Sequence, residues 1–322
     1  MRVCEIIERA QGPLFTFELL PPLKGETIDS IYQAIETLLP YNPAYINITN
    51  HQMETIYTER EDGLLERHST RKRPGTIGLA AAIQYKYGVE VVPHLICGGV
   101  SAEQIEDELS ELIFLEIENV LVLRGDPPHG EKRFSAVQGG HAHSDSLVKQ
   151  IATNQWSAAK FCIGVAGYPE KHIEAPNMES DIAMLKQKIE SGAHYIVTQM
   201  FFENSHYFNF VKLCREAGIE VPIIPGIKPL QRKRDLELLP QTFSIEIPSR
   251  LVKAVEKCSS AQEIREVGKQ FCIEQVEELL ASNVAGIHFY TQGRSKVIAE
   301  VVEATYPHKR GYRERSTPIR WQ

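Results

Sequence analysis

The sequence predicts an α/β fold: one closed (β/α)8 barrel with extra helices before its last strand. Short runs rich in β-branched and aromatic residues alternate with longer segments of helical periodicity, which is the pattern of repeated βαβ units. Several runs, such as VLVL at 120–123, are almost continuously apolar, as expected for a sheet covered on both faces. The fingerprint G-x-G-x-x-G is absent after the first run, which favours a closed barrel over an open doubly wound sheet.

Eight segments are predicted to be strands: 14–20, 45–49, 90–97, 119–124, 161–168, 195–202, 222–227 and 286–291. The helical segments between them are interpreted as crossovers on the outside of the sheet. A Ser-x-x-Gln capping box at Ser101 and Gln104 opens the helix predicted at 101–115. Gly192 closes the helix predicted at 180–191. Eight such units in sequence form a TIM barrel.

Two segments depart from regular alternation. Residues 127–144 are rich in Gly, His and Pro, and we expect them to form a long loop after the fourth strand, where such loops usually carry function. Residues 241–281 are predicted to form the additional helical stretch before the last strand. The whole chain, 1–322, is expected to be a single catalytic domain, with 308–322 as a basic C-terminal extension.

Composition and charge exclude several classes of protein. The chain is 43% hydrophobic and 24% charged, and its apolar runs fall short of the roughly 20 residues that cross a bilayer. The net charge of −7 disfavours nucleic-acid binding, and no secretory leader is recognised at the start, so a cytoplasmic location is expected. Six scattered cysteines, with neither C-x-x-C pairs nor His at zinc spacing, predict reduced thiols and no metal site.

Polar side chains recur where the predicted strands end. In barrels of this kind the active site lies at the carboxyl ends of the strands, so these residues are the first candidates for function. A few of them could be strand-end hydrogen-bonding groups, but their number favours a site. They are Glu18, Thr49, His94, Arg124 with Asp126, Tyr168, Gln199 and Tyr290.

Glu18 is the candidate acid of this site. It is flanked by Phe17, Leu19 and Leu20, and a carboxyl group among apolar neighbours has a raised pKa, which suits proton donation near neutral pH. The alternative is a carboxylate paired with a basic group inside the barrel.

Other strand ends carry groups suited to a phosphate and a heterocycle. Arg124 offers a fork for phosphate, Gly125 allows close backbone approach, and Asp126 can accept hydrogen bonds from ring N–H groups. Gln199 offers both a donor and an acceptor. Four further residues could bind the ribityl, pyrophosphate or ribose part of a dinucleotide, although each alone is more often a solvated residue: His172, Glu174, Asp181 and Lys188.

Over residues 15–306 the sequence resembles the methylenetetrahydrofolate reductase family, in particular bacterial-type members made of the catalytic domain alone. The order and spacing of the matching pieces are specific, although no single piece is decisive. They are Phe17-Glu18 with Pro21-Pro22, Ile48-Thr49, Pro93-His94-Leu95, Leu123-Arg124-Gly125-Asp126-Pro127, Tyr168-Pro169-Glu170 with His172 and Glu174-Ala175, Thr198-Gln199 with Phe201-Phe202, Pro225-Gly226-Ile227, and His288-Phe289-Tyr290-Thr291 with Arg294.

The resemblance implies a flavin-dependent oxidoreductase of one-carbon metabolism and methionine supply. NADH or NADPH would reduce bound FAD and leave, and 5,10-methylenetetrahydrofolate would then take the hydride to become 5-methyltetrahydrofolate, in a ping-pong cycle. In this picture Glu18 is the general acid, Asp126 lies by the flavin and pterin rings, and Gln199 serves both substrates. Arg294 would face the glutamate end of the folate, and a homo-oligomer is expected.

The resemblance also implies the residues that bind FAD. They are Thr49, Asn50, Gln52, His94, Arg124, Gly125, Asp126, Ser144, Tyr168, His172, Ala175, Asp181 and Lys188. The chain departs from the family at two places. His143-Ser144 stands where many members have Tyr-Ala, and three leucines, Leu236, Leu238 and Leu239, stand where some bacterial members have an aromatic lid.

Two rival functions remain open from the residues alone. A flavin-free barrel lyase or aldolase commonly needs a Schiff-base lysine or a cluster of metal-binding carboxylates, and the predicted strand ends offer neither. A folate- or flavin-binding carrier without catalysis would have no use for the acid at Glu18. The sequence does not decide between NADH and NADPH, because it has no ribose-reading fingerprint of the doubly wound kind.

Overall fold

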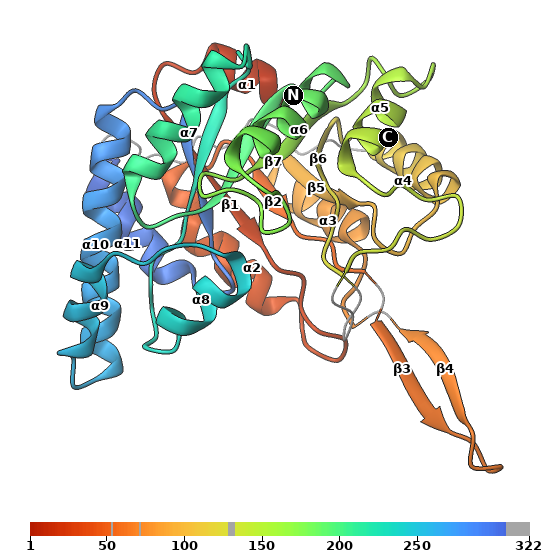
Figure 1. Cartoon of the computed structure of the whole chain (residues 1–322), viewed down its shortest axis with the longest axis horizontal. Coiled ribbons are helices and arrows are strands. Elements are labelled where there is room, and N and C mark those ends of the chain that lie inside the picture. The colour runs from red at the N-terminus through yellow and green to blue at the C-terminus, as the bar shows by residue number, and fades with distance from the viewer. Residues whose placement is uncertain (53, 71, 128–132, 307–322) are drawn as a thin grey trace.

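Eight parallel strands close into a barrel in the computed structural model, which describes residues 1–52, 54–70, 72–127 and 133–306 (Figure 1). Their order around the barrel is β1-β10-β9-β8-β7-β6-β5-β2. The strands are β1 (Leu14–Leu19), β2 (Ile46–Ile48), β5 (Val91–Ile96), β6 (Asn119–Leu123), β7 (Cys162–Gly167), β8 (Tyr195–Met200), β9 (Ile223–Ile227) and β10 (Gly286–Tyr290). The predicted fold class and all eight predicted strands are confirmed.

Helices follow the strands and cover the outside of the barrel, except for α1, which precedes the first strand. They are α1 (Val3–Arg9), α2 (Asp29–Leu38) with the short 3-10 turn η1 (Leu39–Tyr41), α3 (Thr76–Tyr87), α4 (Ala102–Phe114), α5 (Ser144–Thr153), α6 (Met178–Glu190), α7 (Asn204–Glu216), α8 (Asp235–Phe243), α9 (Ser249–Glu256), α10 (Ala261–Ala281) and α11 (Ser295–Thr305). Three of them, α8 to α10, lie between β9 and β10. The extra helices predicted before the last strand are therefore present, and they begin at Asp235, earlier than the predicted residue 241.

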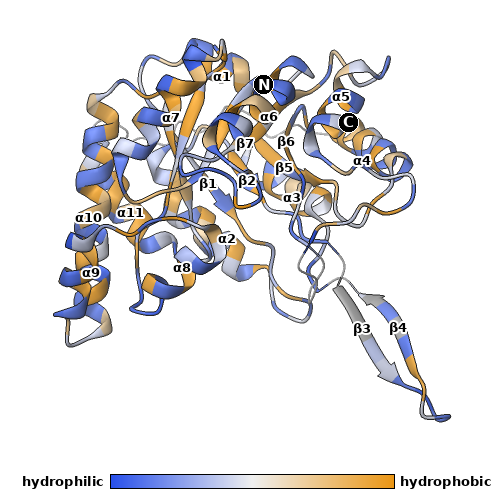
Figure 2. Cartoon of the chain, in the orientation of Figure 1, coloured by the Kyte–Doolittle hydropathy of each residue, from blue (hydrophilic) through white to orange (hydrophobic). Residues whose placement is uncertain are grey.

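The strands bury both faces. Outward residues such as Phe15, Phe17 and Phe289 pack against the helices, while inward residues such as Tyr45 and Tyr195 fill the interior of the barrel. This double burial explains the continuous apolar runs in the sequence. Figure 2 shows the hydrophobic strands inside a more polar outer surface.

The amino end of the barrel is closed by the start of the chain. Val3 of α1 is fully buried beside the interior cluster, and its backbone N–H donates to Oδ1 of Asn119, at the start of β6, over 2.7 Å. The loops that follow the strands therefore open at the other end, where α8 lies (Figure 1). A ligand-binding site at an end of the barrel is therefore expected at the carboxyl ends of the strands.

A layer of polar side chains lies inside the barrel between its apolar floor and its mouth. Thr16, Asn47, His94 and His288 are at most 3% exposed. Thr16 Oγ1 and His288 Nδ1 are 2.8 Å apart, whereas the amide atoms of Asn47 and Nε2 of His94 have no hydrogen-bond partner among the described residues. Buried polar atoms of this kind normally find a partner in protein, water or ligand, so the layer marks the inner end of a binding site.

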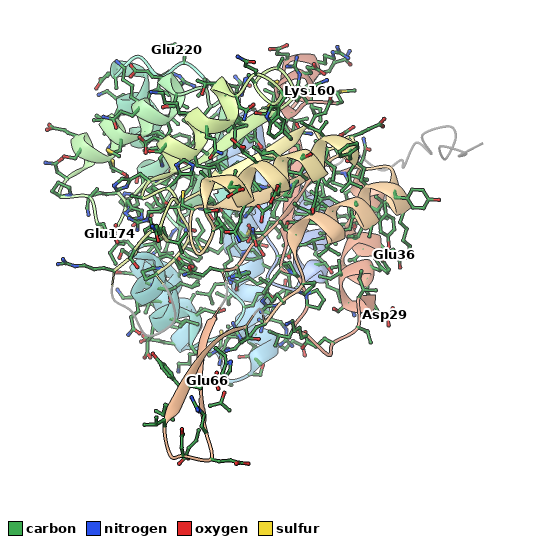
Figure 3. The ribbon with its side chains drawn as sticks, turned by 90° about the vertical axis from the view of Figure 1, so that its right-hand side faces the viewer. Asp29, Glu36, Glu66, Lys160, Glu174 and Glu220 are labelled. Atoms are coloured by element: carbon green, nitrogen blue, oxygen red, sulfur yellow. The ribbon has the colours of Figure 1, made fainter. Side chains whose placement is uncertain are left out.

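The structure contains one element that the sequence analysis missed. β3 (Glu54–Glu59) and β4 (Leu65–Thr70) form an antiparallel hairpin between β2 and α3 that projects away from the barrel (Figure 1). Its turn holds Gly63 at φ +78°, a conformation that glycine adopts at no steric cost. Figure 3, in which Glu66 of β4 is labelled, shows the hairpin extending from the rest of the molecule. The Asp62-Gly63 pair between two extended segments was the available signal.

Helix boundaries differ slightly from the predictions. The capping box at Ser101 and Gln104 is confirmed at the start of α4. The helix predicted to begin at residue 180 begins instead at Met178, because the side chain of Asn177 accepts a hydrogen bond from Ser180 N and caps the helix. Part of the predicted loop 127–144 and the extension 308–322 lie outside the described residues.

The cysteines and the helices agree with two further predictions. All six cysteines are free thiols, and four of them are buried. None of the helices in the described ranges combines the length and the apolar character needed to cross a bilayer.

Candidate active site

Glu18 lies at the mouth of the barrel, one residue before the end of β1. In the sheet register it stands beside Tyr290 on one side and Asn47 on the other, so the three side chains share the inner face. Thr291 Oγ1 donates to the backbone oxygen of Glu18 over 2.7 Å and ties β1 to the loop that follows β10. The acid therefore sits on rigid strands with its carboxyl group at the open end.

Burial inside the barrel mouth raises the pKa of Glu18 to about 8, against an ordinary value of 4.5. The nearby ammonium of Lys228 opposes this rise but does not cancel it. At pH 7 the carboxyl group is therefore mostly protonated, as a proton donor must be. The predicted rise in pKa is confirmed, but its cause differs from the prediction: Phe17 and Leu19 lie on the outer face of β1, and the interior of the barrel buries the carboxyl group.

Lys228 is a residue of this site that the sequence analysis did not identify. It follows directly after β9, its side chain is almost fully buried, and its ammonium donates to Oε1 of Gln292 over 2.6 Å. Burial lowers the pKa of Lys228 to about 8. The sequence could have identified Lys228, because it is a polar residue at the carboxyl end of a predicted strand, as the other candidates are.

Strands β10, β9 and β8, which follow β1 around the barrel, are held together by hydrogen bonds between polar side chains and the backbone. Tyr290 Oη donates to the backbone oxygen of Thr198 over 2.6 Å, and Thr198 Oγ1 accepts from Gly226 N over 2.9 Å. A register shift between Val197 and Met200 brings Gln199 to the rim, where its Oε1 accepts from Met200 N. The amide nitrogen of Gln199 is then the group left to meet a ligand.

The end of β6 presents Arg124, Gly125 and Asp126. The guanidinium of Arg124 forms an ion pair with Glu174 and lies 5.1 Å from the ring centroid of Phe134. Gly125 has φ +86°, and an added Cβ would meet Ile96 Cβ at 3.4 Å, so the turn requires glycine. The side chain of Asp126 is exposed. Asp126 and Glu18 lie at the same end of the barrel.

A cavity of about 250 Å³ beside β6 and β7 brings together seven of the thirteen predicted FAD residues: Arg124, Ser144, Tyr168, His172, Ala175, Asp181 and Lys188. The backbone N–H of His172 donates to Oδ2 of Asp181 over 2.9 Å, and the ring of His172 stands edge-on to Tyr168 with centroids 4.7 Å apart. Lys188 Nζ donates to the backbone oxygen of Ala166 over 3.2 Å. Burial lowers the pKa of Lys188, while Asp181 opposes that shift.

The other predicted FAD residues lie on neighbouring strand ends. Thr49 and Asn50 follow β2, and the side chain of Gln52 donates to the backbone oxygen of Asp126, which links the ends of β2 and β6. His94 lies deeper, in the polar layer of the barrel, where burial lowers its pKa to about 3 and keeps the imidazole neutral. A neutral ring with a free Nε2 is a group that a heterocycle can engage.

These residues fit a dinucleotide cofactor. α5 begins at Ser144 on the edge of the 250 Å³ cavity and its N-terminus has no side-chain cap, so its first N–H groups, together with Lys188 and Arg124, can face a phosphate. Asp145 in the same turn and Glu174, which pairs with Arg124, also line the cavity. The partnerless atoms of His94 and Asn47 supply polar contacts for a ring system at the barrel mouth.

Arg294 does not line this cavity and lies between β10 and α11. It precedes the first residue of α11 and lines a groove of about 1040 Å³ outside the barrel mouth. The leucines of the lid segment lie in α8: Leu239 is buried in a cluster with Leu230 and Phe271, and Leu238 is 44% exposed. Leu239 therefore serves the core rather than a lid.

The fold and this rim define a (β/α)8-barrel protein with its candidate site at the carboxyl ends of the strands. The family model for methylenetetrahydrofolate reductase matches residues 2–306, and the chain belongs to that family.

Three similar proteins illustrate the range of the family and the fold. Methylenetetrahydrofolate reductase (NADH) 1 of Arabidopsis thaliana is 32% identical over 300 residues, which is 90% of this chain and 48% of the relative. The 5,10-methylenetetrahydrofolate reductase of Pectobacterium carotovorum is 26% identical over 283 residues, 88% of this chain and 86% of the relative. An uncharacterized Clostridium thermocellum protein that binds two copies of 5-methyl-5,6,7,8-tetrahydrofolic acid shares the fold, with TM-score 0.56, 15% identity, and coverage of 94% of this chain and 98% of that chain. The chain spans about half the length of the plant and yeast relatives it matches.

Proposed function

We propose that this chain reduces 5,10-methylenetetrahydrofolate to 5-methyltetrahydrofolate with NADH or NADPH, through FAD, in a ping-pong cycle. The observation that carries the proposal is Glu18, a carboxylic acid with a pKa of about 8 at the mouth of the barrel. Family membership over residues 2–306 supports the substrate. Relatives are named for both nicotinamides, so either is a candidate co-substrate.

FAD would supply the hydride relay, accepting from the nicotinamide and giving to the folate. The cavity beside β6 and β7 would hold its phosphate and sugar part, through Arg124, Lys188 and the start of α5. His172, fixed by Asp181, would orient the same part of the cofactor. The turn at Gly125 would allow close backbone approach to the rings.

Glu18 would hold the proton that folate reduction needs. The methylene bridge of the substrate is closed in an imidazolidine ring, which must open before the carbon can accept a hydride. Glu18 would donate its proton to a ring nitrogen as the C–N bond breaks, which is general acid catalysis by a group whose pKa lies near the working pH. Nicotinamide oxidation needs no such proton, so Glu18 would act in one half-reaction only.

Three other residues would position the substrates. Asp126 would lie against the flavin and pterin rings, and Gln199 would offer its amide nitrogen to folate and nicotinamide in turn. Arg294 would receive the glutamate carboxylates of the folate.

The test is Glu18→Gln, which keeps the shape of the side chain and removes the proton donor. We expect bound FAD to be retained and bleached by anaerobic NADH at the normal rate, while folate reduction falls by roughly 10² to 10⁴-fold. The matched control is Glu220→Gln, an exposed residue at the end of the molecule away from the hairpin (Figure 3). Normal folate turnover by Glu18→Gln would remove the acid role, and a colourless protein inert to NADH and NADPH would remove the proposed function.

A further inference from the structure

Glu170, His206 and Glu246 form a cluster that the proposed function does not use. Glu170 lies in the loop after β7, His206 in the first turn of α7, and Glu246 in the segment between α8 and α9. Each side chain offers one ligand atom, and these three atoms lie within 4.8 Å of one another. Imidazole and carboxylate groups are side chains that bind transition-metal ions in proteins. The cluster therefore has the donor set of a metal site, built from three segments that are distant in the chain.

Glu170 is the buried member of the cluster. Its side chain is only 7% exposed, and its Oε1 atom is buried without a hydrogen-bond partner among the described residues. Its Oε2 atom accepts from the backbone N–H of Glu246 over 2.6 Å, which fixes the carboxylate beside the other two ligands. A buried carboxylate oxygen normally has a partner in the protein, in water or in a bound ligand. The missing partner of Oε1 is the observation that points to a ligand at this place.

The charges of the cluster do not balance without a further cation. Within the part of the chain that the structure describes, the ion-pair contacts of both carboxylates are with His206. A single imidazole, even when protonated, carries one positive charge against two carboxylates. Lys171 is the cation next to Glu170 in the chain, but its ammonium donates to two backbone oxygens of its own loop, over 3.0 and 2.7 Å. A divalent cation would neutralise both carboxylates.

The spacing of the ligand atoms suits a metal better than it suits hydrogen bonds. Nε2 of His206 lies 3.4 Å from Oε2 of Glu246 and 3.9 Å from Oε2 of Glu170. Both distances exceed the roughly 2.7–3.2 Å of an N–H···O hydrogen bond. Ligands about 2.0–2.2 Å from a tetrahedral Zn²⁺ lie about 3.3–3.6 Å apart, so one pair already has this spacing and the other must close by only about half an ångström.

The cluster is open to solvent although the segment that carries Glu246 is anchored. Ile245 and Ile247 pack into the hydrophobic cluster formed by residues of α8, α9 and α10, and the side chain of Glu246 between them is 79% exposed. His206 is partly exposed. An ion can therefore enter from solvent, and water can complete its coordination beside three protein ligands.

We propose that Glu170, His206 and Glu246 bind one Zn²⁺ ion. Mg²⁺ and Ca²⁺ prefer oxygen ligands alone, whereas Zn²⁺ accepts an imidazole together with carboxylates. The scattered cysteines gave no sign of this site, because none of its ligands is a cysteine.

The bound ion would join the loop after β7, the start of α7 and the segment between α8 and α9. The loop after β7 also carries Tyr168 and His172 to the cavity beside β6 and β7, so the ion would hold one wall of that cavity in place. Zinc binding of this kind does not depend on which substrate the chain reduces.

The test is calorimetric titration of the whole protein with ZnCl₂, after divalent ions have been removed with EDTA. We expect one Zn²⁺ per chain and a melting temperature raised by roughly 5 °C at saturation, because an ion that binds the folded chain stabilises it. Glu170→Gln, which keeps the shape of the side chain, and His206→Gln should each weaken the affinity more than about 100-fold. The matched control is His68→Gln, since His68 and Glu66 form an exposed pair on the hairpin, and it should keep the wild-type affinity.

X-ray absorption of the one-to-one complex identifies the ligands. It should show nitrogen and oxygen at about 2.0 Å, and a sulfur shell at about 2.3 Å would mean that cysteines bind the ion instead. Unchanged affinity in both Glu170→Gln and His206→Gln would show an adventitious ion only and overturn the assignment. Absence of binding at millimolar ZnCl₂ would also overturn it, and the cluster would then be an ion pair of one imidazole with two carboxylates.

Discussion

Charged and acidic side chains are paired within the protein on one side of the barrel mouth and are mostly unpaired on the other. Beside β6 and β7, Arg124 is paired with Glu174, and Asp181 accepts a hydrogen bond from the backbone of His172. Around β1, β9 and β10, the carboxyl group of Glu18 has no hydrogen-bond partner within the described residues, and the cations around Arg294 are mostly unpaired.

This difference matches the ligands proposed for each half. A cofactor that stays bound is best held by side chains whose positions are fixed by ion pairs and hydrogen bonds within the protein. A substrate that enters and leaves in each cycle can supply the missing partners itself, and the protein accepts the cost in stability while the site is empty. We call the part around β1, β9 and β10 the folate half and the part beside β6 and β7 the cofactor half. In the folate half, removing an unpaired charge should stabilise the fold.

The largest effect on stability should follow from Glu18→Gln as the pH rises. Because burial raises the pKa of Glu18 from 4.5 to about 8, the folded chain holds a proton that the unfolded chain loses, and the wild type loses stability between these two values. The free energy of unfolding of the variant should exceed that of the wild type by a margin that grows to about 1–3 kcal/mol near pH 8. Urea unfolding at pH 5 and pH 8.5 measures it, and a constant difference would contradict the unpaired state of Glu18.

On the cofactor half, Gly125→Ala should do the opposite. Gly125 has φ +86°, which costs an L-residue about 1–2 kcal/mol, and the new Cβ would press on Ile96. We expect a lower melting temperature and less FAD retained on purification. Gly12→Ala is the control, because nothing lies within 4 Å of its added Cβ. Unchanged FAD content in Gly125→Ala would show that the cofactor does not depend on this turn.

The smallest expected effect concerns the influence of Lys228 on the pKa of Glu18. Lys228 lowers the pKa of Glu18, so Lys228→Met should raise that pKa above about 8 and move the alkaline limit of folate reduction to higher pH, by less than about one unit. Lys228→Arg keeps the charge and should leave the limit near its wild-type position. A shift to lower pH in the Met variant would mean that Lys228 acts on Glu18 in another way.

The barrel was predictable because its strands are buried on both faces and read as apolar runs. The hairpin of β3 and β4 was missed because its strands are polar and project away from the barrel, so they form no apolar run and leave only the Gly63 turn as a signal (Figure 2). Asn177 was overlooked as a helix cap because Ser180, three residues on, offers the same chemistry.

The site was partly predictable for a similar reason. The rise in the pKa of Glu18 was predicted in the right direction, although Phe17 and Leu19 face outward and the barrel interior, formed by strands distant in the chain, buries the carboxyl group. Lys228 and the grouping of Arg265 with Arg294 could not be inferred, because whether a surface cation is paired depends on segments distant in the chain. The roles of the other predicted residues stay predictions.

The central claim is that one buried acid serves folate reduction and not flavin reduction, and the pH dependence of the two half-reactions tests it most directly. Stopped-flow rates of folate reduction should be high below pH 8 and fall about tenfold per unit above it, because Glu18 loses its proton there, and this limb should vanish in Glu18→Gln. Flavin reduction by NADH should lack that limb. An identical alkaline limb in both half-reactions, or its persistence in Glu18→Gln, would contradict the account.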